Sequence, residues 1–192
     1  MALGADPTHG LRTLIQTTAS AREYPSPMSN DSQTPIVAVL MGSNSDWPVM
    51  KHCVQTLESL GVPSVAKVMS AHRAPDAVAD FCKNAEEQGV KIIIAAAGGA
   101  AHLAGACAAH THLPVLGVPL VGWSLDGLDA LLSTVQMPRG VPVATFAIGK
   151  AGAVNAALAA VSILALSDES LRERLVAYRA TQSADSIMDP HD

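Results

Sequence analysis

The sequence predicts an α/β protein built on a parallel sheet. Short apolar runs of strand length alternate along the chain with longer stretches whose apolar residues recur at helical spacing. Gly, Pro or charged residues separate these runs. Such alternation is typical of βαβ units, in which helices cover both faces of the sheet. Because five runs have strand character, we expect a flavodoxin-like three-layer αβα sandwich with a five-stranded parallel sheet.

Five apolar segments have the length and composition of buried strands. They are residues 36–41, 64–69, 90–97, 114–120 and 141–148. Most of their residues are Val, Ile, Leu or Ala, in continuous runs rather than in strict alternation with polar residues. Strands that are covered on both faces have this pattern. The five segments are therefore expected to form the centre of the domain.

The segments between and after the strands predict helices. From residue 46 to about 60, Val49, Cys53 and Leu57 share one face, and Gly61 is the expected end. A second helix is favoured from Pro75, because Pro is common at the first position of a helix. The remaining helices are expected from Pro75 to Gly89, from the glycines after residue 97 to about His110, and over 124–133, 150–166 and about 168–181.

One domain is expected over residues 35–182, between two tails. Residues 1–34 are rich in Pro, Ser, Thr and Asp and have no periodicity, so they predict a flexible N-terminal extension. Residues 183–192 are expected to be a disordered tail. The rest of the 192-residue chain has the length of one ordinary domain.

Composition and charge exclude several classes of function. A net charge of −5 argues against a nucleic-acid-binding protein, which needs a basic face. The apolar runs are too short for a membrane span, and no secretory signal is evident, so a cytoplasmic location is expected. Hydrophobic residues make up 49% of the chain and charged residues only 15%. This balance predicts that part of the surface is buried against copies of the same chain.

No signature of a resident cofactor or metal is present. The chain has no Walker loop and no G-x-G-x-x-G after the first strand. Cys53, Cys82 and Cys107 are scattered singly, which is not the spacing of a zinc site or a redox pair. His110 and His112 form an H-x-H pair without an evident third ligand. We therefore expect neither a cofactor nor a metal.

The first candidate site loop is GSNSDWP, residues 42–48, directly after the first strand. In parallel sheets, ligands bind beyond the carboxyl ends of the strands. Ser43, Ser45 and Asp46 lie where the next helix begins, and a helix N-terminus offers free N–H groups and partial positive charge to a phosphate. Asp46 is also suited to accept hydrogen bonds from ribose hydroxyls. The alternative is that these residues are ordinary helix caps.

The second loop, SAHRAP, follows the second strand and presents Ser70, His72 and Arg73 at the same edge. Arg offers a planar fork of donors that suits phosphate. His titrates near neutral pH and is the usual proton carrier. A single His is more commonly a surface or capping residue, but Ser and Arg beside it at a strand end favour a binding site.

The third loop, AAAGGAAHLAG, follows the third strand. Gly98 and Gly99 allow a ligand to approach the backbone closely, although they also permit tight helix packing. His102 is expected in the first helical turn, facing the same crevice. The three loops together predict a site that binds a phosphorylated metabolite and transfers protons.

Five motifs together resemble a known enzyme family. They are MGSNSDW, VMSAHRAPD, AAAGGAAHLAG, LDGLDALLSTVQMPRGVPV and AIGKAGAVNAALAA. In order and spacing they resemble the class I phosphoribosylaminoimidazole carboxylase catalytic subunits, which are the N5-carboxyaminoimidazole ribonucleotide mutases of de novo purine (IMP) biosynthesis. The resemblance covers about residues 35–180.

The resemblance implies a cofactor-free mutase that acts on a ribonucleotide. In this reaction a carboxyl group moves from the exocyclic nitrogen to carbon 4 of the imidazole, through release and recapture of carbon dioxide, with a histidine as proton carrier. By motif match that histidine is His72. The match assigns the substrate to Ser43, Asp46 and Arg73, with Ser45 and Ser70 near the phosphate and His102, Gly98 and Gly99 around the carboxylate.

The resemblance also implies a partner and an assembly. Members of the family are homo-octamers with active sites at subunit junctions. A transient contact with the ATP-dependent carboxyaminoimidazole ribonucleotide synthetase is compatible with an unstable substrate. Ala96, Ala104 and Ala106 depart from the family pattern, which has Gly, Pro and Met at these positions.

Two other functions remain open. A class II aminoimidazole ribonucleotide carboxylase, which uses free carbon dioxide, typically has SAHKGP, AGRSN and LPSG where this chain has SAHRAP, AGGAAH and MPRG. A non-catalytic nucleotide- or flavin-binding module would need aromatic side chains to stack on its ligand, and neither Trp47 nor Trp123 lies in a clear stacking motif.

Overall fold

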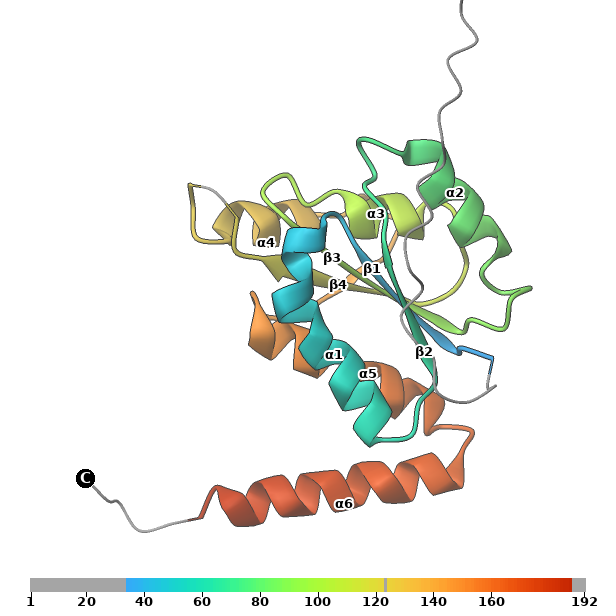
Figure 1. Ribbon diagram of the computed structural model, residues 1–192, viewed down its shortest axis with the longest axis vertical. Helices are drawn as coiled ribbons and strands as arrows, with labels where there is room; N and C mark the ends of the chain where they lie inside the picture. The colour runs from blue at the N-terminus through green and yellow to red at the C-terminus, as the bar shows by residue number, and fades with distance from the viewer. Residues whose placement is uncertain (1–33, 123, 188–192) are drawn as a thin grey trace, which may run out of the picture. The chain divides into compact units, whose positions relative to one another are not determined.

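The computed structural model describes residues 34–122 and 124–187, and five parallel strands form its centre (Figure 1). The strands are β1 (Val37–Met41), β2 (Ser64–Val68), β3 (Ile92–Gly98), β4 (Val115–Leu120) and β5 (Ala144–Thr145). The helices are α1 (Trp47–Ser59), α2 (Pro75–Asn84), α3 (Leu103–Ala108), α4 (Leu128–Val135), α5 (Lys150–Leu164) and α6 (Glu169–Asp185), and a 3-10 turn, η1 (Asn44–Asp46), precedes α1.

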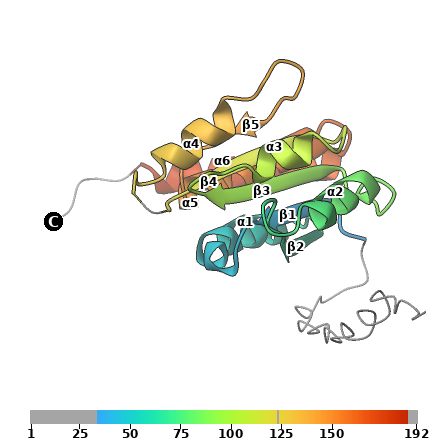
Figure 2. The same ribbon diagram turned by 90° about the horizontal axis from the view of Figure 1, so that it is seen from above.

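The sheet has the strand order β2-β1-β3-β4-β5 (Figure 2), and all neighbouring strands are parallel. At the end of β1, Met41 lies opposite Val68 of β2 and Ala96 of β3. The loops that follow these strands therefore emerge side by side at one edge. The flavodoxin-like αβα architecture expected from the sequence is confirmed.

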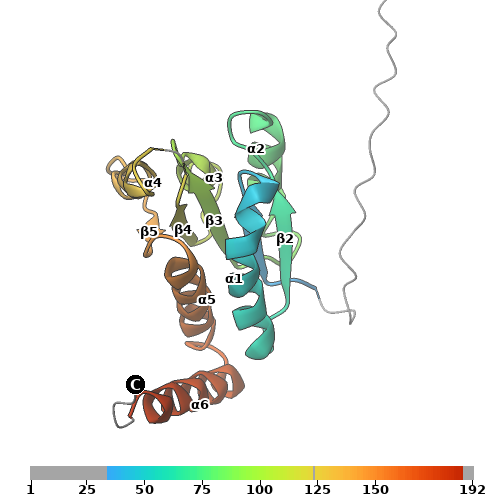
Figure 3. The same ribbon diagram turned by 60° about the vertical axis from the view of Figure 1, so that its left-hand side comes forward.

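Helices cover both faces of the sheet. On one face, α1 and α5 lie side by side (Figure 3) and cover Val37 and Val39 of β1. On the other face, Ala38 and Leu40 pack with residues of α2 and α3. Four buried alanines of α5, Ala153, Ala156, Ala157 and Ala160, let this helix approach its neighbours closely. Burial on both faces explains why β1 is apolar at every position.

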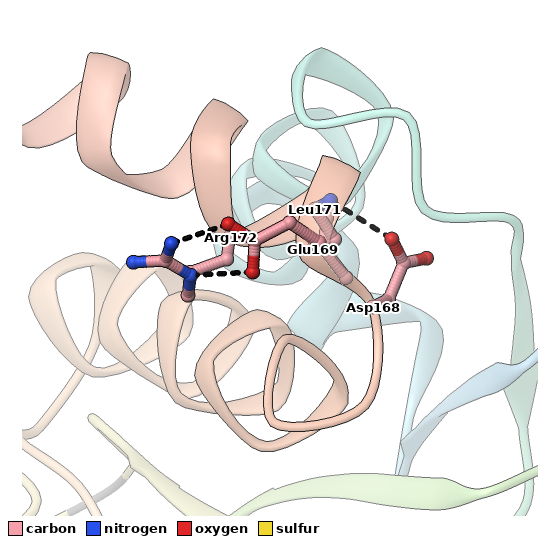
Figure 4. A network of polar contacts seen from close by, with 4 residues as sticks. All are labelled: Asp168, Glu169, Leu171 and Arg172. Atoms are coloured by element: carbon pink, nitrogen blue, oxygen red, sulfur yellow. Dashed lines mark hydrogen bonds and ion pairs between the residues drawn. The ribbon is translucent and has the colours of Figure 1, made fainter.

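The last helix, α6, is anchored through its first half. Asp168 caps its N-terminus by accepting a hydrogen bond of 3.0 Å from the Leu171 amide, and Arg172 pairs with Glu169 one turn away (Figure 4). Leu171 is buried in the same core as α1. Arg174 donates a hydrogen bond of 2.8 Å to the carbonyl of Leu60, at the end of α1. None of the described helices is long and apolar enough to cross a membrane.

Two predicted elements near the carboxyl side of the sheet have different bounds. The fifth strand, expected over 141–148, is limited to Ala144–Thr145. It lies at the edge of the sheet, and Pro142 lacks the N–H that a longer ladder would need. The helix expected from residue 124 begins only at Leu128, because Asp126 and Gly127 adopt φ values of 48° and 88°, which a helix does not accommodate.

Helix ends also differ from those expected. The second helix ends at Asn84 rather than at Gly89, because residues 85–88 form turns that lead to a φ of 89° at Gly89. The last helix continues to Asp185, so its final residues occupy the start of the expected tail 183–192. Residues 188–192 and all of the expected extension except Thr34 lie outside the described residues. The domain limits 35–182 stay a prediction.

Candidate active site

A cavity of about 430 Å³ lies at the carboxyl ends of β1, β2, β3 and β4; we call it the site cavity. All the residues predicted for the site except Gly99 line it: Ser43, Ser45, Asp46, Ser70, His72, Arg73, Gly98 and His102. The parallel topology thus brings together three loops that are far apart in the sequence. A cavity of this size suits a ligand of small-metabolite dimensions.

The loop after β1 is ordered by its own side chains. Ser43 caps η1, and its amide donates a hydrogen bond of 2.9 Å to Oδ2 of Asp46. The Ser45 hydroxyl donates to Oγ of Ser43 across 2.9 Å. The expected capping role is therefore present, and the same residues also line the site cavity. Capping and ligand binding are compatible here because both use the start of a helix.

Asp46 is a half-buried carboxylate at this helix start. Burial raises its pKa, and hydrogen bonds from the Ser43 and Gly42 amides and the positive charge of Arg73 oppose that effect. Loss of hydration is the largest influence. The carboxylate is thus held in place by the Ser43 amide, with its charge only partly compensated, which favours acceptance of further hydrogen bonds from a ligand.

Arg73 extends from the loop after β2 toward the loop after β1. Its Nη2 donates a hydrogen bond of 3.1 Å to the carbonyl of Gly42, and its own amide donates across 3.3 Å to Oγ of Ser70. The side chain is exposed to the site cavity. Because a guanidinium has five N–H donors, the contact with Gly42 leaves donors available for an anion.

The two histidines of the site are in direct contact. Nε2 of His72 lies 2.8 Å from Nδ1 of His102, and the rings are nearly perpendicular, at 88°. His102 directly precedes α3, and its side chain makes no capping hydrogen bond with that helix. One imidazole must donate and the other accept, so this pair forms a short path for a proton at the wall of the site cavity.

Close packing of two loops defines the position of the glycines. A Cβ on Gly122 would lie 2.9 Å from the Gly99 amide nitrogen, and one on Gly98 would lie 3.3 Å from the Leu120 carbonyl oxygen. Gly99 has a φ of 63°. Gly99 was expected to line the carboxylate pocket, but it does not line the site cavity and instead makes the turn after β3.

Sequence reasoning missed several lining residues. Val121 and Gly122, directly after β4, line the site cavity, as do Ala71, Ala97, Ala100 and Leu103. Their position after the predicted strand 114–120 was the available signal, but they carry no reactive group. The departures Ala96, Ala104 and Ala106 do not line the site cavity, and Ala96 and Ala104 are buried in the core.

A second hollow, of about 600 Å³, lies next to the amino ends of β4 and β5. It is lined in part by Lys83, His110, His112 and Gly140. It contains none of the residues at the carboxyl ends of the strands. Among residues 34–122 and 124–187, no three His, Cys, Asp or Glu side chains are grouped as metal ligands would be. Of these two cavities, only the smaller site cavity is therefore lined by predicted site residues.

Comparison with known protein families gives a match along most of the chain. Residues 36–185 match the family described as AIR carboxylase. The chain belongs to the AIR carboxylase family. The match to AIR carboxylase takes in every loop that lines the site cavity, from Gly42 to Gly122.

Curated AIR carboxylase relatives are similar over nearly their whole length. The N5-carboxyaminoimidazole ribonucleotide mutase of Pseudomonas aeruginosa is 54% identical over 157 residues, which cover 82% of this chain and 96% of that protein. The mutase of the same name from Bacillus subtilis is 57% identical over 141 residues, with 73% and 87% covered. A crystal structure of Treponema denticola PurE superposes with a TM-score of 0.72 at 26% identity, covering 79% of this chain and 93% of that one.

Proposed function

We propose that this protein is an N5-carboxyaminoimidazole ribonucleotide mutase of purine biosynthesis. The observation that carries the proposal is a single cavity that combines a histidine pair with groups suited to a phosphorylated ribose. Three relatives that bear this name are 54%, 56% and 57% identical to the chain over most of its length. The reaction is an isomerisation in which the carboxyl group leaves the exocyclic nitrogen and is attached to carbon 4 of the imidazole.

The phosphate of the substrate is assigned to the start of α1. Ser43 and Ser45 present hydroxyls there, and the helix terminus adds partial positive charge. Arg73 supplies a full positive charge from the neighbouring loop, and Ser70 a hydroxyl beside it. Asp46, held by the Ser43 amide, is placed to accept hydrogen bonds from the ribose hydroxyls. This division leaves the imidazole of the substrate near the histidines.

His72 is the proposed proton carrier. When the N–C bond breaks, carbon dioxide leaves and the exocyclic nitrogen takes a proton from His72. Carbon 4 then forms a bond to the same carbon dioxide and returns its proton to His72, so protons balance over the cycle. Such a proton shuttle contributes about 10²–10⁴-fold to the rate. Retention of carbon dioxide beside its acceptor supplies a further gain through proximity.

His102 and Gly98 are proposed to surround the migrating carboxylate. Nδ1 of His102 lies 2.8 Å from Nε2 of His72. Whether Nδ1 donates or accepts in this hydrogen bond decides if the other ring nitrogen of His102, Nε2, carries a proton that it can present to the carboxylate. Gly98 lets the carboxylate lie against the backbone. Gly99 contributes by making the turn after β3, which supports the part of the site cavity lined by Gly98 and His102. No cofactor or metal is required by this scheme, since the carboxyl group comes from the substrate itself.

We also propose a cytoplasmic homo-octamer with its sites at subunit junctions. Leu128, Leu132 and Val135 recur at helical spacing on α4 and are each close to half exposed. Val121, which lines the site cavity, is 62% exposed. An apolar face this close to the cavity supports burial by another copy of the chain.

Transient contact with the synthetase that makes the substrate is part of the same proposal. Sedimentation velocity tests the assembly.

One experiment tests the activity. The purified protein and a His72→Asn variant receive N5-carboxyaminoimidazole ribonucleotide, or aminoimidazole ribonucleotide with low bicarbonate, and the carbon-carboxylated product is followed by ultraviolet absorbance. We expect rapid turnover of the first substrate alone, lost in His72→Asn and kept in a His112→Asn control, whose histidine lines the second hollow. Efficient use of the second substrate would indicate a class II carboxylase. Turnover of neither would leave a nucleotide-binding module.

A further inference from the structure

We infer that Ser133, on α4, is a positioning residue that holds the loop before α3 and thereby sets the hydrogen bond between His102 and His72. Ser133 does not line the site cavity. It lies on α4, whereas His102 lies in the loop before α3, 31 positions earlier in the sequence. The inference rests on the proposed function, because it assigns a role within that reaction.

The hydroxyl of Ser133 bridges α4 and the loop. It donates to the carbonyl oxygen of Asp129, four residues earlier, across 2.8 Å. Since a hydroxyl has one proton and two lone pairs, its oxygen remains free to accept. It accepts a hydrogen bond of 3.0 Å from the amide of Ala101, the residue immediately before His102. The helix thus holds the loop through one oriented hydroxyl.

The surroundings make this contact difficult to replace. Ala101 is only 2% exposed, so water cannot readily serve its amide if the hydroxyl is removed. Thr134, the next residue of α4, is buried; its hydroxyl donates across 2.7 Å to the carbonyl four residues earlier and lies against the loop, 3.5 Å from the Ala101 carbonyl oxygen. Earlier in the same loop, Gly99 packs against the segment after β4, where a Cβ on Gly122 would lie 2.9 Å from the Gly99 amide nitrogen. The loop before His102 is therefore held at two points.

The position of this peptide determines where the imidazole of His102 lies. The amide of His102 donates to the carbonyl of Ala100 across 2.9 Å, which closes a tight turn around Ala101. The side chain makes no hydrogen bond to the start of α3 and instead meets Nε2 of His72. A shift of the turn would therefore be transmitted to the contact between the two rings, whereas the phosphate loop after β1 would be unaffected.

The test compares Ser133→Ala, which removes the acceptor, with Ser133→Thr, which keeps a hydroxyl. Ser162→Ala on α5 is the matched control, because Ser162 is also half-buried and donates across 2.8 Å to the carbonyl four residues earlier. With N5-carboxyaminoimidazole ribonucleotide as substrate, we expect Ser133→Ala to lower kcat by up to about tenfold, no more than removal of the His102 imidazole itself. KM should change little, and the pH profile of kcat should change shape. Ser133→Thr should restore both, and Ser162→Ala should match the wild type.

Two further measurements separate positioning from general damage. In a His102→Asn background, Ser133→Ala should cause little additional loss of kcat, since its effect passes through His102. Fully multiplicative losses would overturn the inference. Crystal structures of both Ser133 variants should show the distance from His72 Nε2 to His102 Nδ1 lengthened beyond hydrogen-bond range in Ser133→Ala only.

The outcomes also distinguish this inference from the proposed function. A wild-type protein that turns over the substrate, with an unchanged Ser133→Ala variant, would refute the role of Ser133 alone. A wild-type protein that is inactive with this substrate would refute the mutase proposal. In that case the crystallographic distance decides the positioning role, and an unchanged contact in Ser133→Ala overturns it.

Discussion

Nε2 of His72 lies within 2.8 Å of Nδ1 of His102, so the two rings of the site share one hydrogen bond. This bond exists only while at least one of the two nitrogens lacks a proton, because two protonated imidazoles are both donors at every nitrogen. One ring therefore donates an N–H to the lone pair of the other. The pair is suited to hold one proton during a reaction cycle.

The two histidines should have unequal effects on turnover. We expect His72→Asn to lower kcat by about 10²–10⁴-fold, as the loss of a proton shuttle does. His102→Asn should lower kcat by about tenfold, the equivalent of one hydrogen bond. Steady-state kinetics with N5-carboxyaminoimidazole ribonucleotide measures both. If His102→Asn caused the larger loss, the roles of the two residues would have to be exchanged.

Asp46→Asn should separate stability from substrate binding. Asn keeps an oxygen that accepts a hydrogen bond from the Ser43 amide. It removes the negative charge of the Asp46 carboxylate, whose pKa is raised by burial. KM should rise by about tenfold or more, since the proposed hydrogen bond from the ribose to a charged carboxylate is lost. The free energy of unfolding at pH 7 should not fall.

The pH dependence of that stability difference follows from the direction of the shift. A raised pKa in the folded state means that the folded protein binds the proton more readily, so ionised Asp46 opposes folding above its pKa. As pH falls through the folded pKa, this penalty disappears, and the wild type and Asp46→Asn should become equally stable. Denaturant unfolding between pH 7 and pH 4 measures the difference. A gap that widens in acid would contradict the assignment.

Asp168→Ala should lower the melting temperature at neutral pH. The hydrogen bond from the Leu171 amide, together with that from the Ser170 hydroxyl, lowers the pKa of Asp168. A lowered pKa contributes stability above the unfolded value of 3.8, and this is lost as pH falls through the folded pKa. The difference in melting temperature between wild type and variant should therefore begin to shrink near pH 3.8 and vanish below the still lower folded pKa. A constant difference would point to lost packing instead.

Gly122→Ala should destabilise the protein through a backbone clash. Its Cβ would lie 2.9 Å from the Gly99 amide nitrogen, so one of the two loops must shift. We expect a loss of about 1–3 kcal/mol in the free energy of unfolding, typical of overpacking. Gly42→Ala is the control for stability, since its Cβ would make contacts of 3.7 Å or more. Equal effects of the two changes would show that the close approach is not a constraint.

The convergence of the predicted site residues on one cavity follows from the topology of the sheet. Once parallel strands are inferred, the residues after each strand must converge, and Ser43, His72 and His102 do line one cavity. The direct bond between the two histidines was not predictable, because it depends on the path of two loops. Val121 and Gly122 were missed because an apolar side chain and a glycine carry no chemical signal.

The bounds of the elements were less predictable than their order. Residues 141–148 are apolar enough for a strand, but only Ala144 and Thr145 pair with β4. The edge position and Pro142 outweigh composition there. Similarly, the positive φ values at Asp126 and Gly127 delay the start of α4. Local backbone geometry decides such boundaries, and a hydrophobic pattern does not report it.

The hydrogen bond from Arg174 to the carbonyl of Leu60 links residues 114 positions apart in the sequence. Leu60 follows α1, and the opposite end of α1 carries the serine and aspartate loop of the site. The carbonyl of Leu60 therefore gains this side-chain donor only after the last helix has been synthesised and docked. A nascent chain lacking α6 would leave this end of α1 without that contact, so the helix that follows the serine and aspartate loop completes its packing late in biosynthesis.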